Sequence, residues 1–190
     1  MMASLLAKFG GLLFFIRNAW HLRRLSAFKP QEISSIAYRG YVKSDAIAIE
    51  GVYKKLNGGA SFRSLRQYLY DTLGQRCLLV ATQTNERGEE VVIGMNMYYL
   101  NARDVRDKTI HEAFIGVMPQ MAGQGVATTM RKIAIAHFKF AGFLGISSRI
   151  SAENKSSLQS AIKLGFAPVE QYTDISSQSQ RYYMVYKLQD

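Results

Sequence analysis

The stretch V-M-P-Q-M-A-G-Q-G-V-A, residues 117–127, joins an alternating apolar segment to a long amphipathic one. Its glycines, Gly123 and Gly125, let the backbone adopt positive φ angles and approach a ligand without interference from a Cβ atom. The turn opens onto a predicted helix, whose first N–H groups lack intrahelical partners and carry partial positive charge, which suits a pyrophosphate. The same pattern also fits an ordinary tight turn between a strand and a helix, so two alternatives remain.

Two common nucleotide-binding motifs do not fit this loop. Thr128 takes the place of the third glycine in the dinucleotide fingerprint G-x-G-x-x-G, and no βαβ unit with a ribose-binding acid follows. The sequence G-K-[ST] of the P-loop does not occur. The loop therefore disfavours a Rossmann site and excludes a P-loop.

A second motif lies further along the chain. Asn154 stands before a predicted helix that ends with Lys163, Leu164, Gly165 and Phe166. Asn154 can cap this helix and still offer its amide to a ligand. Gly165 is the predicted C-terminal stop, after which Phe166 opens the next strand.

The periodicity on both sides of the loop predicts an α+β domain, with an antiparallel hairpin that feeds a mixed sheet. Apolar and alternating runs predict strands over 33–39, 77–82, 91–99, 109–117, 146–151, 166–172 and 182–188. Amphipathic runs predict helices over 44–56, 61–73, 125–140 and 155–164, and residues 101–108 are predicted to be a polar loop. In the first of these helices Ile47, Val52 and Leu56 are predicted to face inward.

The composition is that of one globular domain with an excess of positive charge. Of 190 residues 48% are hydrophobic and 20% charged, and the net charge is +10. Cys77 is the single cysteine, and His21, His111 and His137 lack the spacing of metal ligands, so no disulfide and no metal site are expected. Half of the net charge lies in residues 1–31, which contain five basic residues and no acid. The rest of the chain is therefore ordinarily basic, and nucleic acid is not an expected partner.

Residues 3–26 are predicted to form a basic amphipathic helix, so we divide the chain into an extension, 1–30, and a main domain, 31–190. Its apolar face comprises Leu5, Leu6, Phe9, Leu12, Leu13, Ile16, Ala19 and Trp20. Its longest apolar run, 12–16, is far shorter than the roughly 20 residues that cross a bilayer, and no signal-peptide cleavage site follows it. The helix either packs on the domain or on a second copy in a homodimer, lies on an anionic membrane surface, or is a disordered tail.

With these motifs the chain resembles the GCN5-related N-acetyltransferases. The resemblance rests on V-x-P-x-x-x-G-x-G-x-A at 117–127, together with N-x-x-S and K-L-G-F between Asn154 and Phe166. It extends over about residues 33–188, and Tyr38, Arg39 and Asp45 also fit the family's opening strand and helix. It implies a mixed, mostly antiparallel central sheet, flanked by helices and splayed open between its fourth and fifth strands, 109–117 and 146–151.

The resemblance implies acetyl-CoA as the acyl-donor co-substrate. The backbone of Ile115, Val117 and Met118 would pair with its pantetheine arm, and the Val117 N–H would donate to the thioester oxygen. The pyrophosphate would lie on Gly123, Gln124, Gly125, Val126 and Ala127. Asn154 would contact the pantetheine or its water.

The implied reaction is direct attack of an amine on the thioester, assisted by a base. The strand before the loop offers His111 and Glu112, of which His111 shares the parity of Ile115 and Val117; for both, a purely structural role is the alternative. The tyrosine that protonates the leaving thiolate in many members is replaced by Ala161. The alternatives are a proton from Tyr172, from Ser160 or from a water, or departure of the leaving group as the thiolate. Tyr172, which is otherwise a packing residue, is the candidate general acid.

The expected function is therefore transfer of acetyl to a primary amine of a small molecule, such as an amino sugar or nucleotide-linked sugar. Two alternatives are acetylation of amines on protein or RNA, and a non-catalytic acyl-CoA-binding module, which Ala161 favours. The expected location is the cytoplasm, with an association with the cytoplasmic face of a membrane through residues 3–26. The acceptor site is expected between 44–73 and 173–180, with Tyr53, Phe62, Tyr68 and Tyr70 as candidate lining residues.

Overall fold

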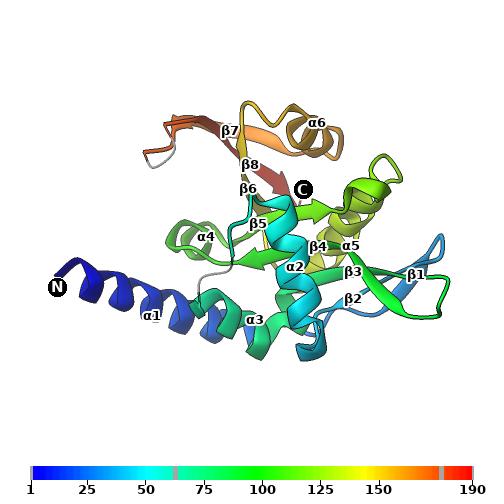
Figure 1. Ribbon diagram of the computed structural model, residues 1–190. Helices are drawn as coiled ribbons and strands as arrows, with labels where there is room; N and C mark the ends of the chain where they lie inside the picture. Colours follow the sequence, from blue (N-terminus) through cyan, green and yellow to red (C-terminus); the bar gives the residue numbers. More distant parts are fainter. Residues whose placement is uncertain (1, 62–63, 176–177, 190) are drawn as a thin grey trace. The chain divides into compact units, whose positions relative to one another are not determined.

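A computed structural model describes residues 2–61, 64–175 and 178–189, and it describes the side chains of these residues except 2–9 and 64–65. The helices of this part are α1 (Met2–Leu22), α2 (Ala46–Leu56), α3 (Ser64–Cys77), α4 (Ala102–Asp107), α5 (Val126–Phe140) and α6 (Lys155–Lys163). Its strands are β1 (Gln31–Ile33), β2 (Ile36–Gly40), β3 (Leu78–Thr84), β4 (Glu90–Tyr99), β5 (Thr109–Val117), β6 (Gly145–Ser151), β7 (Ala167–Thr173) and β8 (Gln180–Lys187). The short 3-10 helices η1 (Lys43–Asp45) and η2 (Pro119–Met121) precede α2 and α5. The predicted α+β class is confirmed (Figure 1).

Over the described residues the strands form one sheet in the order β1-β2-β3-β4-β5-β6-β8-β7. The chain divides into two compact units, of which unit 1 comprises 1–97 and 114–130 and unit 2 comprises 98–113 and 131–190. β5 contributes its second half to unit 1 and its first half to unit 2. The predicted division at residue 30 stays a prediction.

The sheet is mostly antiparallel, as predicted, with one parallel pair in the described part of the chain, β5 with β6. Their ladder joins Thr109 to Gly145 and ends at Glu112 and Ser148. β5 nevertheless continues to Val117 and β6 to Ser151. The ladder thus stops partway along β5 and β6, the two strands between which the family resemblance predicts the splay.

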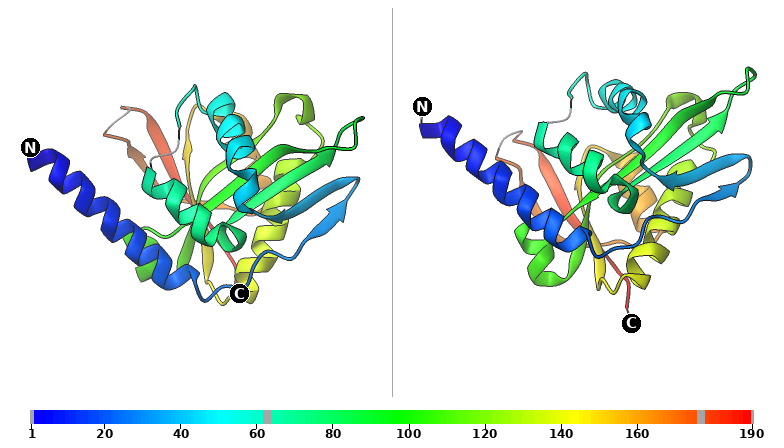
Figure 2. Two further views of the ribbon diagram at one scale, coloured as in Figure 1. Left: turned by 60° about the horizontal axis from the view of Figure 1, so that its bottom comes forward. Right: turned by 90° about the horizontal axis from the view of Figure 1, so that it is seen from below.

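In unit 1 the N-terminal helix α1 packs beside α3, which Figure 2 shows from two sides. The ring of Phe15 lies 5.0 Å from that of Tyr68, and Asn18 and Leu22 are fully buried. After the helix, the Phe28 N–H donates to Gln75 O at 2.8 Å. Of the predicted alternatives, packing of the N-terminal helix on the rest of the chain is therefore observed. The predicted apolar positions Leu5, Leu6 and Phe9 lie outside the described side chains.

Two predicted elements are wrong. Residues 33–39, predicted as one strand, form the hairpin β1–β2, because Ser34 and Ser35 both take positive φ and make a two-residue turn. Residues 101–108, predicted as a loop, contain α4. Asn101 accepts from the Asp104 N–H and Asp104 from the Asn101 N–H, both at 3.1 Å, which is a reciprocal cap.

Details of two predicted helices also differ. Ile47, predicted to face inward, is 89% exposed, and Ile49 is buried in its place. Gly74, the predicted stop of the helix over 61–73, lies inside α3, where a Cβ atom would overlap the ring of Tyr41. That glycine therefore serves close packing and not termination. The candidate pocket residue Phe62 lies outside the described residues.

No helix in the described ranges combines the length and the apolar character that crossing a bilayer requires.

Candidate active site

The phosphate loop follows β5 in unit 1. Gly123 and Gly125 have φ angles of +77° and +78°, so the left-handed backbone that glycine favours is present at both positions. A Cβ atom built on either glycine meets nothing within 4 Å, so the loop borders open space. α5 begins directly afterwards at Val126, whose buried side chain anchors the first turn, and that turn contains no acidic residue. The loop thus offers helix N-terminal N–H groups to an anion.

The end of β5 has one edge in use. The Met118 N–H donates to Ile93 O of β4 at 2.8 Å. Because successive N–H groups of a strand point to opposite sides, those of Ile115 and Val117 point away from β4. The predicted donors Ile115 and Val117 therefore have the orientation that pairing with a ligand needs. Met118 has no N–H to offer, and its carbonyl already accepts from the Met121 N–H at 2.9 Å, so it could serve a ligand only with its second lone pair.

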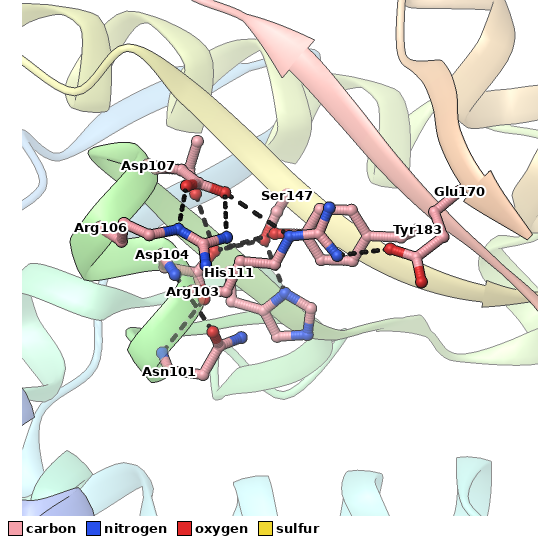
Figure 3. Close-up of polar contacts among 10 residues, drawn as sticks. Asn101, Arg103, Asp104, Arg106, Asp107, His111, Ser147, Glu170 and Tyr183 are labelled. Atoms are coloured by element: carbon pink, nitrogen blue, oxygen red, sulfur yellow. Dashed lines mark hydrogen bonds and ion pairs between the residues drawn. The ribbon is translucent and has the colours of Figure 1, made fainter. Parts of the chain in front are cut away.

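Unit 2 contains a buried polar network centred on Asp104, which Figure 3 shows. Its Oδ1 accepts from Ser147 Oγ at 2.7 Å and Thr109 Oγ1 at 2.8 Å, and Tyr183 OH lies 3.4 Å away. Ser147 Oγ is also 2.8 Å from Nδ1 of the predicted base, His111. All five side chains are buried.

These contacts set the protonation of His111. A serine hydroxyl has one proton, and Ser147 donates it to Asp104 Oδ1. Ser147 Oγ must then accept from His111, so Nδ1 carries a proton. In the neutral imidazole this leaves the lone pair on Nε2. The network therefore holds His111 in the tautomer that can accept a proton at Nε2.

Arg103 packs against Tyr183 at one side of the network. Its guanidinium lies 3.8 Å from the centroid of the Tyr183 ring and makes an ion pair with Glu170 at 2.6 Å (Figure 3). Burial raises the pKa of the Tyr183 phenol, so its hydroxyl stays protonated and acts toward Asp104 as a donor. The Asp104 carboxylate is thus surrounded by donors.

Glu112, the other predicted base, belongs to a second buried group in unit 2. Its carboxylate is paired with Arg131 of α5, with Nη2 to Oε1 at 2.7 Å and Nε to Oε2 at 3.0 Å. Both side chains are 2% exposed or less. Arg131 Nη1 also donates to Ser160 Oγ at 3.0 Å. The carboxylate is committed to this ion pair, which favours a structural role for Glu112.

Asn154 and Tyr172 also lie in unit 2. Asn154 Oδ1 accepts from the Ser157 N–H and from Ser156 Oγ, both at 3.1 Å, so it caps α6 as predicted. Its amide nitrogen is the atom that remains to serve a ligand. The Tyr172 hydroxyl is buried and has no hydrogen-bond partner among the described residues. A buried hydroxyl of this kind requires an explanation, and a ligand is one.

Sequence reasoning missed Asp104, Ser147 and Arg131. Two signals for them exist. Asn101 and Asp104 have the spacing of a capping box, and Arg131 stands three and seven residues before the buried Ala134 and Phe138, on the apolar face of α5. Among the described residues no group of three or more His, Cys, Asp or Glu side chains could hold a metal ion.

Comparison with known proteins adds a family match. Residues 49–166 match the family model described as the acetyltransferase (GNAT) family. No protein of curated function matches the chain.

Three solved structures illustrate the similarity in fold. Their sequence identity to this chain is low, so they support a shared fold and nothing further. The ribosomal-protein-S18-alanine N-acetyltransferase of Escherichia coli is 13% identical, with a TM-score of 0.63 over 82% of this chain and 95% of its own. NAA60 of Arabidopsis thaliana, in complex with acetyl-CoA, is 13% identical, with a TM-score of 0.68 over 80% and 99%. The Salmonella typhimurium protein yncA, whose structure contains acetyl-CoA, is 20% identical, with a TM-score of 0.65 over 83% and 96%.

Proposed function

The chain belongs to the acetyltransferase (GNAT) family and is an N-acetyltransferase that uses acetyl-CoA, and from this premise we propose that its acceptor is the primary amine of a small molecule. The observation that supports binding of the acyl donor is the glycine loop, with positive φ at Gly123 and Gly125 and open space before the first turn of α5. A protein N-terminus is the second candidate acceptor, because similar folds include the S18-alanine enzyme. A cytoplasmic location is part of the proposal, since Cys77 is a single buried thiol.

The chain's own groups divide the work of binding the donor. Gly123, Gln124, Gly125, Val126 and Ala127 bind the pyrophosphate through backbone N–H groups at the start of α5. In unit 1, Ile115 and Val117 turn their N–H groups away from β4 and donate to the pantetheine, and Met118 adds its carbonyl. In unit 2, the Asn154 amide is the group that donates to acetyl-CoA. Acetyl-CoA supplies the activated acetyl group. The Val117 N–H stabilises negative charge on the thioester oxygen.

His111 removes the proton of the attacking amine. The support for this role is the tautomer that Asp104 imposes through Ser147, with Nδ1 protonated and the lone pair on Nε2. Asp104 also stabilises the imidazolium that forms when Nε2 accepts a proton. Glu112 acts on the reaction through Arg131, by fixing β5 and α5 within unit 2.

Tyr172 donates a proton to the leaving thiolate. Its support is chemical: the hydroxyl is buried without a partner among the described residues, and a phenol can donate a proton. Ala161, at the family's usual tyrosine position, is fully buried in α6 and cannot fill this role.

The acceptor class is tested by incubating the full chain with acetyl-CoA and two panels, small primary amines including amino sugars, and peptides with free N-termini. The measurement is release of free CoA thiol with mass spectrometry of the acceptor. A mass increase on a small amine supports the proposal. Acetylation confined to peptides assigns the second candidate, and CoA binding without turnover on either panel contradicts both.

Gly125→Ala is expected to raise KM for acetyl-CoA by about ten-fold or more. The new Cβ disfavours the φ of +78° and turns the N–H groups of the loop away from the pyrophosphate. Gly142→Ala is the matched control, because Gly142 also has a positive φ of +85° with nothing near its Cβ, but it lies beyond the far end of α5. Equal KM changes in both variants would show that the loss is general strain and would remove the loop from the donor site.

Tyr172→Phe is expected to lower kcat while leaving the free energy of unfolding unchanged or higher. The substitution removes a buried hydroxyl that has no described partner, which folding alone should tolerate or favour by about 1 kcal/mol. A catalytic acid, in contrast, contributes about 10²-fold or more. Urea unfolding and steady-state kinetics measure the two quantities, and wild-type kcat in the variant would make Tyr172 a packing residue.

A further inference from the structure

Helix α1 has two apolar faces, of which the structure covers one. Phe15, Asn18 and Leu22 lie on the face that packs beside α3. Four large apolar side chains lie on the other side and are half exposed: Leu12 at 50%, Leu13 at 50%, Ile16 at 54% and Trp20 at 53%. At roughly 100° per residue these four occupy an arc of about 100°, whose centre lies about 140° around the helix from that of the packed face. We call them the α1 stripe.

The charge around the α1 stripe has one sign. Residues 1–31 contain Lys8, Arg17, Arg23, Arg24 and Lys29 and no acidic residue. The guanidinium carbons of Arg23 and Arg24 lie 4.1 and 5.3 Å from the Trp20 ring, so two cations stand at the end of the stripe. An exposed tryptophan beside arginines is typical of the boundary between acyl chains and lipid headgroups.

We propose that the α1 stripe docks on an anionic lipid bilayer, with α1 lying in the plane of the headgroups. The apolar side chains enter the acyl boundary, and Arg23 and Arg24 meet the lipid phosphates or carboxylates. An apolar stripe whose members are contiguous, unlike single exposed apolar residues, is typical of an interaction surface. The proposal does not depend on the acetyl acceptor, because no residue of the stripe belongs to the donor or acid–base groups.

Charge separates this occupant from a second copy of the chain. Two α1 stripes facing each other would bring arginine onto arginine in a parallel pair and onto the other basic end of the partner helix in an antiparallel pair, and residues 1–31 supply no acidic side chain for either arrangement. Like charges in such contact disfavour the dimer, whereas an anionic bilayer neutralises the same cations. A nucleic acid would use the cations but would leave the apolar stripe in water.

The unmodified chain provides the first experiment. Trp20 is the single tryptophan of the protein, so its fluorescence reports on the stripe alone. Vesicles of phosphatidylcholine with 30% phosphatidylserine are expected to shift its emission to the blue, and brominated acyl chains in such vesicles are expected to quench it. Pure phosphatidylcholine should produce a much weaker effect. Vesicle binding without a change in Trp20 emission would overturn the proposal.

Flotation of variants with the same vesicles separates the two contributions. Leu13→Ser with Ile16→Ser is expected to lower the partition coefficient about ten-fold for each side chain, and Arg23→Glu with Arg24→Glu at least about 25-fold. The controls are Ile47→Ser, another exposed apolar residue of unit 1, and Lys55→Glu with Lys132→Glu, which changes the net charge equally. Both controls should bind like the wild type.

Three outcomes would contradict the proposal: stripe variants that float like the wild type, controls that lose as much binding as the stripe variants, or equal binding of the wild type to neutral and anionic vesicles. Sedimentation velocity gives a fourth. A wild-type dimer that Leu13→Ser with Ile16→Ser converts to a monomer would assign the stripe to a second copy. If a stripe variant does not fold by circular dichroism, the Trp20 measurement on the wild type decides alone.

Discussion

His111→Gln is expected to lower kcat for amine acetylation by about 10²- to 10⁴-fold while leaving KM for acetyl-CoA near its wild-type value. Glutamine can still donate to Ser147 Oγ, so the hydrogen bond to the network is retained, but its amide cannot accept a proton. The acid limb of the kcat/KM profile should also disappear. The wild type is expected to have this limb because a protonated imidazole cannot act as a base.

Ser147 and Asp104, which orient His111, are positioning residues, and their variants should change the pH profile differently from His111→Gln. Ser147→Ala removes the acceptor of the Nδ1 proton, so the imidazole is free to change tautomer, and kcat should fall by about 10-fold or more. Because the imidazole is still present, the acid limb should remain, with its midpoint displaced. Ser148→Ala is the matched control, since Ser148 neighbours Ser147 on β6 but faces Glu112 at 3.5 Å.

Steady-state kinetics from pH 5 to 9 with a saturating amine decide between the roles. Wild-type kcat in His111→Gln would exclude the imidazole as base. An equal loss in Ser147→Ala and Ser148→Ala, with no change in either profile, would show that the serines only support packing. Neither result would bear on acetyl-CoA binding by the glycine loop, because no residue of the network belongs to that loop.

The sequence predicts the glycine loop well because every part of its chemistry is local. Positive φ at Gly123 and Gly125 and the start of α5 at Val126 follow from the order of neighbouring residues. The same holds for β5, where alternation alone predicts the observed bounds Thr109–Val117. Local patterns therefore suffice for the α+β class and for the donor loop.

The Asp104 network could not be predicted in this way because its members come from distant segments. Asp104 lies on α4, Ser147 on β6 and Tyr183 on β8, and only the sheet register brings them to His111. Polar residues such as Ser147 look like ordinary interruptions of an apolar strand. The turn at Ser34 and Ser35 could not be predicted for another reason. Positive φ is usually marked by glycine or asparagine, and both positions are serine.

Glu112→Leu is expected to lower the free energy of unfolding by about 3–5 kcal/mol. The substitution leaves the Arg131 guanidinium buried in unit 2 without the carboxylate that accepts from its Nε and Nη2 atoms. Of the contacts described for Arg131, the hydrogen bond to Ser160 Oγ would remain, and its guanidinium carbon would still lie 5.6 Å from the centroid of the Phe166 ring. Urea unfolding followed by circular dichroism measures the loss.

The variant that combines Glu112→Leu with Arg131→Met should recover most of that stability, because removing both charges also removes their desolvation cost. A double variant as unstable as Glu112→Leu would show that the two residues contribute through separate contacts. Glu112→Gln separates structure from chemistry, since it keeps the shape but removes the charge. Lost stability with a near-normal kcat in the surviving folded fraction fits the ion pair, whereas full stability with kcat reduced about 10²-fold or more would make Glu112 the base in place of His111.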